Sequence, residues 1–129
     1  MNLTPKKLKY LGILEKEINK AKKQLIIVEG KKDKTSLEKL GLKNIFIINE
    51  CGKSIYEKIE QIEERADKKK ICILTDFDKK GKKLYLMIKS ELSKRKVKID
   101  SSLRFILLKL EITHIEGLAG FINKKWQRI

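Results

Sequence analysis

The chain has 129 residues and a net charge of +15, which fits one domain with a modest hydrophobic core and a strongly basic surface. No stretch approaches the roughly 18 apolar residues of a membrane span, and the N-terminus lacks the apolar block and cleavage site of a secretory signal. The two cysteines, Cys51 and Cys72, have no metal-ligand spacing and indicate no disulfide framework, so we expect a cytoplasmic protein that does not contact a membrane.

Helix and strand patterns alternate along the first half of the chain. Thr4, followed by a proline, predicts the start of a helix in which leucine and isoleucine recur at helical spacing. The segment QLIIVEG predicts a short buried strand that ends at Glu29. Asp33 is expected to cap a short helix that stops at Gly41.

The alternation continues in the second half. The segments NIFIIN and KICILTD are apolar runs that predict two further strands, and helical spacing of apolar residues follows each, from Ile55 and from Leu84. Ser101 is expected to cap another helix. The segment ITHIE predicts a short fourth strand, and residues 117–126 predict a terminal helix.

Strands that alternate with helices predict an α/β fold in three layers. We expect a mostly parallel sheet of about four strands with helices on both faces, preceded by an N-terminal helix. The predicted strands are continuously apolar, as strands must be when both faces of the sheet are covered.

Three acids are expected at the carboxyl edge of this sheet. Glu29 ends the first predicted strand, Asp76 ends the third, and Asp78 lies just beyond it. Because ligands bind at that edge and like charges repel, the arrangement favours a hard cation such as Mg²⁺. Gly30 and Gly81 are expected where the backbone turns tightly or approaches a ligand closely. The alternative is that each acid is a helix cap or a surface charge, as Asp78 alone could be.

The positive charge is unevenly distributed. Residues 1–24 carry seven bases and two acids, residues 25–78 carry eleven of each, and residues 79–98 carry nine bases and one acid. A positive field beside a neutral segment that contains acids indicates a polyanionic partner such as nucleic acid. A solvated basic surface without a partner is the alternative.

Four lysines lie at the start of the helix that follows the acids. Their position is unusual, because positive charge is unfavourable near a helix N-terminus. Positions of this kind tend to mark functional surface, and together with the helix start they predict an anion site beside the metal. These residues are Lys79, Lys80, Lys82 and Lys83.

The segments IIVEGKKD and ILTDFDKKG resemble the Toprim domain, which is shared by bacterial-type primases, topoisomerases, OLD-family nucleases and the ribonuclease that matures 5S rRNA. In that family a glutamate closes the first strand and a D-x-D pair closes the third, which matches Glu29, Asp76 and Asp78. The overall layout, with VKID and HIEGL near the end, is similar to small stand-alone archaeal Toprim proteins.

The resemblance covers residues 23–106, which implies a Toprim domain there. Helical spacing predicts an N-terminal helix over residues 1–22, and residues 107–129 are expected to form a C-terminal extension that packs on the same domain. The resemblance also implies that the three acids hold one or two Mg²⁺ ions, for which Mn²⁺ can substitute, with Glu29 as general acid or base. The neighbouring lysines would hold the backbone of RNA or DNA, with strongly salt-dependent binding. They are Lys31, Lys32, Lys79, Lys80, Lys82 and Lys83.

Metal-dependent phosphodiester hydrolysis is the family activity that this chain could perform alone. Primases and topoisomerases need further domains, and Tyr10, Tyr56 and Tyr85 lack the context of a strand-transfer nucleophile. The alternative is a non-catalytic adapter that binds RNA or DNA within a larger processing complex.

His114 is the only histidine in the chain. Because it lies within the predicted fourth strand, we expect a structural role for it. The nearby Glu111 and Glu116 leave a role at the edge of the site open.

Overall fold

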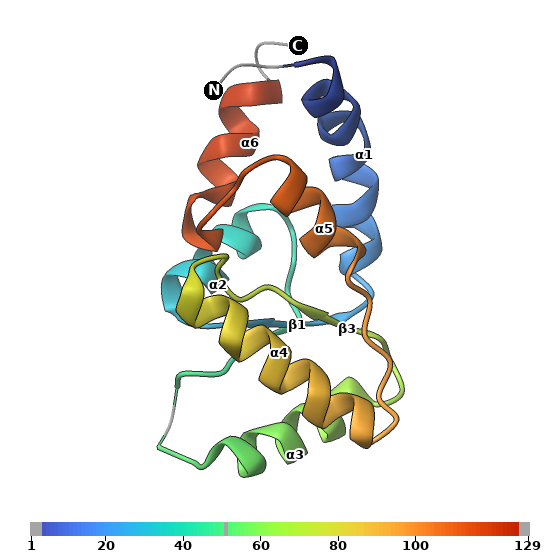
Figure 1. Ribbon diagram of the computed structural model, residues 1–129, viewed down its shortest axis with the longest axis vertical. Helices are drawn as coiled ribbons and strands as arrows, with labels where there is room; N and C mark the ends of the chain where they lie inside the picture. The colour runs from blue at the N-terminus through green and yellow to red at the C-terminus, as the bar shows by residue number, and fades with distance from the viewer. Residues whose placement is uncertain (1–3, 51, 127–129) are drawn as a thin grey trace.

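The computed structural model describes residues 4–50 and 52–126, with side chains described as far as Asn123. Six α-helices, three strands and one 3₁₀ turn follow one another in this part of the chain (Figure 1). None of these helices is long and apolar enough to cross a bilayer. In chain order they are α1 (Pro5–Ala21), β1 (Leu25–Val28), α2 (Lys31–Lys39), β2 (Ile45–Ile47), α3 (Ile55–Ala66), β3 (Ile71–Ile73), α4 (Lys79–Lys94), α5 (Ser102–Lys109), η1 (Ile115–Gly117) and α6 (Leu118–Trp126).

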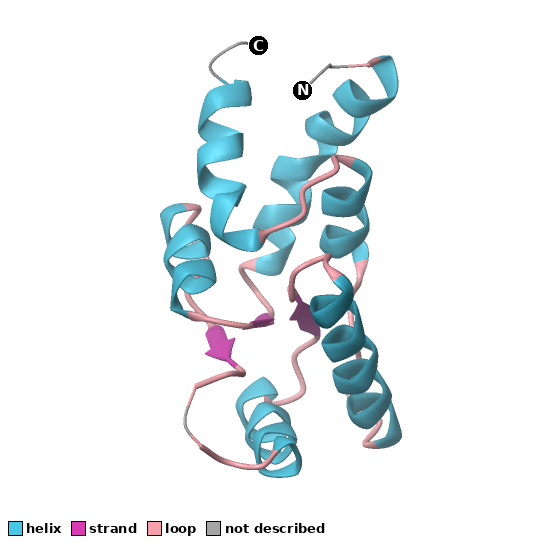
Figure 2. Cartoon of the chain, turned by 60° about the vertical axis from the view of Figure 1, so that its left-hand side comes forward, coloured by secondary structure: helices cyan, strands magenta, loops and turns pink. Residues whose placement is uncertain are grey.

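The sheet is parallel and has the strand order β2-β1-β3. Figure 2 shows the strands in magenta, in the middle of the molecule between the helices. Within β1, Ile26 pairs with Ile45 of β2 and with Cys72 of β3. An isolated parallel bridge between Ile71 and Ile99 extends the sheet slightly beyond β3. The predicted α/β fold with a leading helix is therefore confirmed.

The predicted fourth strand at residues 112–116 is wrong. His114 is extended, but it is the residue before η1, which begins at Ile115. The segment donates and accepts hydrogen bonds with the loop after β3 instead of forming a ladder: the Phe77 N–H binds the Thr113 carbonyl, and the Ile115 N–H binds the Asp76 carboxylate. With its backbone groups used in this way, the segment cannot pair as a strand.

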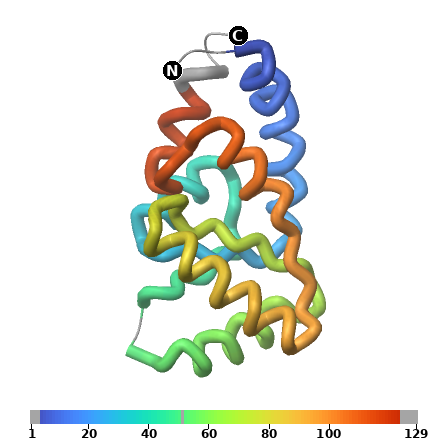
Figure 3. The backbone as a smooth tube through the Cα atoms, viewed as in Figure 1, coloured from blue at the N-terminus to red at the C-terminus, as the bar shows by residue number. Residues whose placement is uncertain are grey.

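Helices cover both faces of the sheet, as the apolar strands predict. Alternate residues of β1 face opposite sides, so Ile26 and Val28 lie in one core with apolar residues of α1, α5 and α6. Leu25 and Ile27 lie in a second core with residues of α3 and α4. Figure 3 traces this division, with α3 and α4 together on one side and α1 and α5 on the other.

The helix starts were partly predictable. The Thr4 hydroxyl accepts a hydrogen bond from the Lys7 N–H and caps α1 as expected. Helix α2 begins at Lys31, three residues earlier than a cap at Asp33 predicts, and Asp33 lies in its first turn. Among the described residues the Ser101 side chain makes no capping hydrogen bond to α5. The carboxylate of Asp100 accepts the Ser102 N–H there instead, at 3.0 Å.

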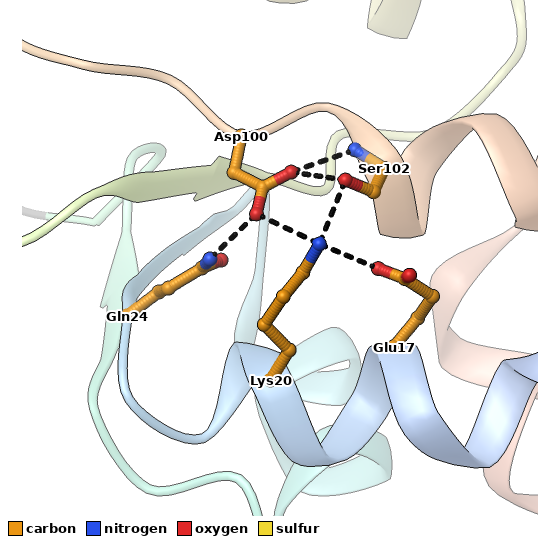
Figure 4. Close-up of polar contacts among 5 residues, drawn as sticks. All are labelled: Glu17, Lys20, Gln24, Asp100 and Ser102. Atoms are coloured by element: carbon orange, nitrogen blue, oxygen red, sulfur yellow. Dashed lines mark hydrogen bonds and ion pairs between the residues drawn. The ribbon is translucent and has the colours of Figure 1, made fainter.

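A polar network centred on Asp100 joins α1 to the start of α5 (Figure 4). Its carboxylate accepts hydrogen bonds from the Gln24 amide at 2.8 Å and from Ser102, and it pairs with Lys20 at 3.2 Å. Lys20 also contacts Glu17 at 3.1 Å. Burial by itself raises the pKa of Asp100, but the hydrogen bonds from Ser102, Gln24 and Lys20 outweigh it and hold that pKa well below its usual range.

The variant Asp100→Asn is expected to lower the free energy of unfolding at pH 7 by about 1.5 to 3 kcal/mol, the range for hydrogen bonds to a charged group. Because the folded-state pKa is depressed, this stability is present above the unfolded-state value of 3.8 and is lost as pH falls towards the folded-state value. Urea unfolding of both proteins should therefore show a difference that shrinks between pH 5 and pH 2. An equal change in Asp67→Asn, which alters an exposed acid outside this network, would contradict the assignment.

Candidate metal and nucleic-acid site

Glu29 and Asp76 meet at the carboxyl edge of the sheet, as predicted. Glu29 follows β1 directly, and Asp76 lies three residues after β3. The Glu29 carboxylate accepts a hydrogen bond from the Asp76 backbone N–H at 2.7 Å, and the Asp76 carboxylate accepts one from the Ile115 N–H at 3.0 Å. Both side chains are half-buried, so the neighbouring backbone fixes two acids close together.

Asp78 has two roles in its position before α4. Its Oδ1 atom accepts the Gly81 N–H at 2.8 Å and so caps the helix, which is the local role that the sequence left open. Its Oδ2 atom lies 4.0 Å from the Nε2 atom of His114. One carboxylate oxygen of Asp78 therefore caps α4, and the other faces His114.

Asp76, Asp78 and His114 form a group that can hold a metal ion. Each offers one ligand atom, and these atoms all lie within 4.8 Å of one another. Two carboxylates and an imidazole suit a divalent cation. Glu29 lies outside this group, so the donor set differs from the predicted trio by one member. The sequence predicted a structural role for His114 and left a role at the edge of the site open, and its place in this group favours the second role.

A further acid lies close to Glu29 and Asp76 at this edge. Asp33, in the first turn of α2, is 7% exposed and accepts the Gly30 N–H at 3.0 Å. Burial raises the pKa of Asp33, and the charges of Asp76 and Glu29 raise it further. A bound cation would relieve this repulsion, so the electrostatics of the edge favour metal binding.

The start of α4 packs directly against the backbone of Asp76. A Cβ atom at Gly81 would lie 2.1 Å from the Asp76 carbonyl oxygen, and the Thr75 hydroxyl donates to the Gly81 carbonyl at 2.7 Å. The close approach at Gly81 is to the backbone of Asp76, whereas the sequence predicted a tight turn or a close approach to a ligand. At Gly30 the expectation has no steric basis among the described residues, because a Cβ there would meet nothing within 4 Å and φ is −144°.

Arg104 is a buried residue that sequence reasoning missed. Its guanidinium donates to the carbonyls of Thr75 at 2.7 Å and Asp76 at 3.3 Å. It is 7% exposed and lies between the rings of Phe77 and Tyr85, with 4.4 Å and 4.2 Å to their centroids. The arginine thereby holds the loop that carries the aspartates. An arginine within the otherwise apolar run LRFILL was the available signal.

The six predicted lysines surround this edge. Helices α2 and α4 both begin at the carboxyl ends of their preceding strands, so their first turns flank the acids. All six side chains are exposed, which leaves them free to contact a polyanion. They are Lys31 and Lys32 at the start of α2, and Lys79, Lys80, Lys82 and Lys83 at the start of α4.

Comparison with known proteins connects this arrangement to a family. Residues 23–101 match the Toprim domain, a region that contains the predicted acids and ends before His114. A UPF0292 protein of Methanocaldococcus jannaschii is 37% identical over 120 residues, which are 91% of this chain and 92% of that protein. A UPF0292 protein of Methanosarcina barkeri is 32% identical and covers 78% of this chain and 70% of its own length.

Two further similarities concern an enzyme and a solved structure. Ribonuclease M5 of Mesoplasma florum is 40% identical over 62 residues, which are 47% of this chain and 35% of that protein. The solved structure of a protein from Aquifex aeolicus has a TM-score of 0.69 and 33% identity, and the match covers 82% of this chain and 95% of that one.

Proposed function

Because the chain belongs to the Toprim domain family, we propose that it binds Mg²⁺ or a similar divalent cation and hydrolyses phosphodiester bonds of nucleic acid. Asp76 and Asp78 would be its main metal ligands, for one or two ions. Glu29 would hold or move a proton at the reacting phosphate. The similarity to a ribonuclease supports nucleic acid as the substrate class.

One observation carries this proposal: the metal-ligand group and the lysine-bearing helix starts share one edge of the sheet. Asp76, Asp78 and His114 offer ligand atoms within 4.8 Å of one another. Exposed lysines of α2 and α4 lie beside them. A phosphodiester needs both features, because its backbone charge must be held and the charge that develops during cleavage must be stabilised.

In this proposal the lysines bind the substrate, and the acids hold the metal ion or a proton. A bound divalent cation supplies Lewis-acid stabilisation and orients the attacking water. The lysines hold the flanking phosphates, and the Ile115 N–H fixes one oxygen of Asp76 at 3.0 Å. Glu29, hydrogen-bonded to the Asp76 N–H at 2.7 Å, stands next to the ligand that it would assist.

A second candidate function is a non-catalytic adapter that binds RNA or DNA, with the metal in a structural role. The position of Glu29 favours the adapter. Its carboxylate accepts a hydrogen bond from the Asp76 backbone N–H and lies outside the ligand group. In that case another protein of a larger complex would supply the chemistry.

A cleavage assay separates the two functions. End-labelled structured RNA, single-stranded DNA and duplex DNA are incubated with the protein in Mg²⁺, in Mn²⁺ and in chelator. Cutting that needs the metal supports hydrolysis and identifies the substrate. Salt-sensitive binding without cutting in any metal supports the adapter. Absence of both binding and cutting contradicts both functions.

The lysines of α4 are expected to dominate binding of nucleic acid. Replacing three of them should lower affinity at least about tenfold at 0.1 M salt and flatten the slope of log affinity against log salt by roughly 2 to 3. The control changes lysines that flank β3 at the opposite, amino edge of the sheet. The test variant is Lys79→Gln, Lys80→Gln and Lys83→Gln, and the control is Lys69→Gln, Lys70→Gln and Lys98→Gln. Equal losses in a salt titration of both variants would contradict a localised interface.

A further inference from the structure

We propose that His114 is a ligand of the metal ion and gives the site a preference for transition-metal ions over Mg²⁺. This inference rests on the proposed metal site at Asp76 and Asp78 and assigns its third protein ligand. An imidazole nitrogen binds Co²⁺ and Zn²⁺ well, whereas Mg²⁺ strongly prefers oxygen. The chemistry of the donor set therefore predicts which ion the protein selects.

The backbone places His114 opposite the two aspartates. The Thr113 carbonyl accepts the Phe77 N–H at 3.0 Å, and the Ile115 N–H donates to the Asp76 carboxylate at 3.0 Å. These hydrogen bonds involve the residues on either side of His114, so both ends of the histidine's peptide segment are fixed to the aspartate loop. Ile115 is fully buried and anchors the segment further.

The imidazole ring is oriented for ligation. Its Nδ1 atom lies 3.0 Å from the Thr113 hydroxyl, a hydrogen bond that leaves Nε2 facing Asp78. Metal-bound histidines commonly bind the ion through one ring nitrogen and hydrogen-bond through the other. Metal binding through Nε2 requires the tautomer in which Nδ1–H donates to the Thr113 hydroxyl, and in that tautomer the lone pair of Nε2 points towards the acids.

The spacing fits a shared ion better than a direct contact. The Nε2 atom of His114 and the Oδ2 atom of Asp78 are 4.0 Å apart, which is too long for a hydrogen bond. Two ligand atoms that each lie about 2.1 Å from one ion are separated by roughly 3 to 4 Å. His114 and Asp78 are both exposed, so an ion can reach this position from solvent.

Metal titrations of the full chain test the assignment without reference to catalysis. Isothermal titration calorimetry with Co²⁺, Mn²⁺ and Mg²⁺ compares the wild type with His114→Gln, and the visible absorption of bound Co²⁺ reports nitrogen ligation. We expect His114→Gln to weaken Co²⁺ binding at least about 100-fold, because loss of a residue that only supports a ligand already costs about 10- to 100-fold. Mn²⁺ binding should weaken less, and Mg²⁺ binding by less than about threefold. Thr113→Val should weaken Co²⁺ binding by a smaller factor, because the ligand remains but its orientation is lost.

The outcomes separate this inference from the proposed site. Glu111→Gln is the matched control, since it changes a nearby exposed acid outside the ligand group and should leave all three affinities unchanged. Equal Co²⁺ affinity and an unchanged Co²⁺ spectrum in His114→Gln would overturn the histidine ligand while the aspartate site stands. Absence of binding of all three ions to the wild type would overturn both.

Discussion

The variant Asp76→Asn is expected to reduce metal-dependent cleavage at least about 100-fold, because loss of residues that only support a ligand already costs about 10- to 100-fold. Its fold should be retained. The asparagine oxygen can still accept the Ile115 N–H, and the Glu29 carboxylate still accepts the backbone N–H of residue 76. Removal of one negative charge should also leave nucleic-acid binding equal or tighter. Initial cleavage rates, thermal unfolding and a band-shift titration measure the three effects.

Asp67→Asn is the matched control for this change. Asp67 is exposed and follows α3, at the opposite end of the fold from the site. Its backbone is left-handed with φ 45°, a conformation that asparagine also adopts readily. We expect unchanged activity in Asp67→Asn. If Asp76→Asn lost activity only because it unfolds at the assay temperature, the direct role of Asp76 would be contradicted.

The variant Gly81→Ala is expected to lower the free energy of unfolding by about 3 kcal/mol or more, at or above the usual cost of overpacking. The added methyl group would lie 2.1 Å from the Asp76 carbonyl oxygen and 2.6 Å from its carbon, so the backbone must move. That movement displaces the Asp76 loop and the cap from Asp78 together. Urea unfolding measures the loss of stability, and Co²⁺ titration measures the accompanying loss of metal affinity.

Gly12→Ala makes the same substitution where space is open. Gly12 lies within α1, and a Cβ there would meet no described atom within 4 Å. Since alanine has the higher helix propensity, this control should raise the free energy of unfolding by up to about 1 kcal/mol. A similar gain in Gly81→Ala would show that the close approach at Asp76 does not exist.

Local patterns predicted the elements and the edge on which the site lies. The Toprim resemblance is confirmed, and so are the leading helix and the apolar strands. Glu29 and Asp76 are 47 positions apart in the chain, yet their contact could be expected because parallel strands share one carboxyl edge. Helix boundaries were less accurate, since α2 begins at Lys31 and Asp33 acts from inside its first turn.

His114 and Arg104 show what local patterns could not supply. The segment around His114 was predicted as a strand, but its backbone groups bond to the loop after β3. Arg104 is spaced like an ordinary helix residue, but it lies under the aspartate loop and bonds to carbonyls about thirty positions earlier. The contacts of these two residues with the loop after β3 can be identified only when the positions of α5 and η1 relative to the sheet are known.

The amino-acid sequence by itself determined the order of helices and strands as far as α5, the acids at the ends of β1 and β3, and the lysines at the helix starts. These features depend on neighbours within a few positions and on the general geometry of parallel sheets. Only the tertiary structure decided that His114 joins Asp76 and Asp78 while Glu29 stands outside their group. That choice depends on hydrogen bonds between segments distant in the chain, which form only once the whole fold is assembled.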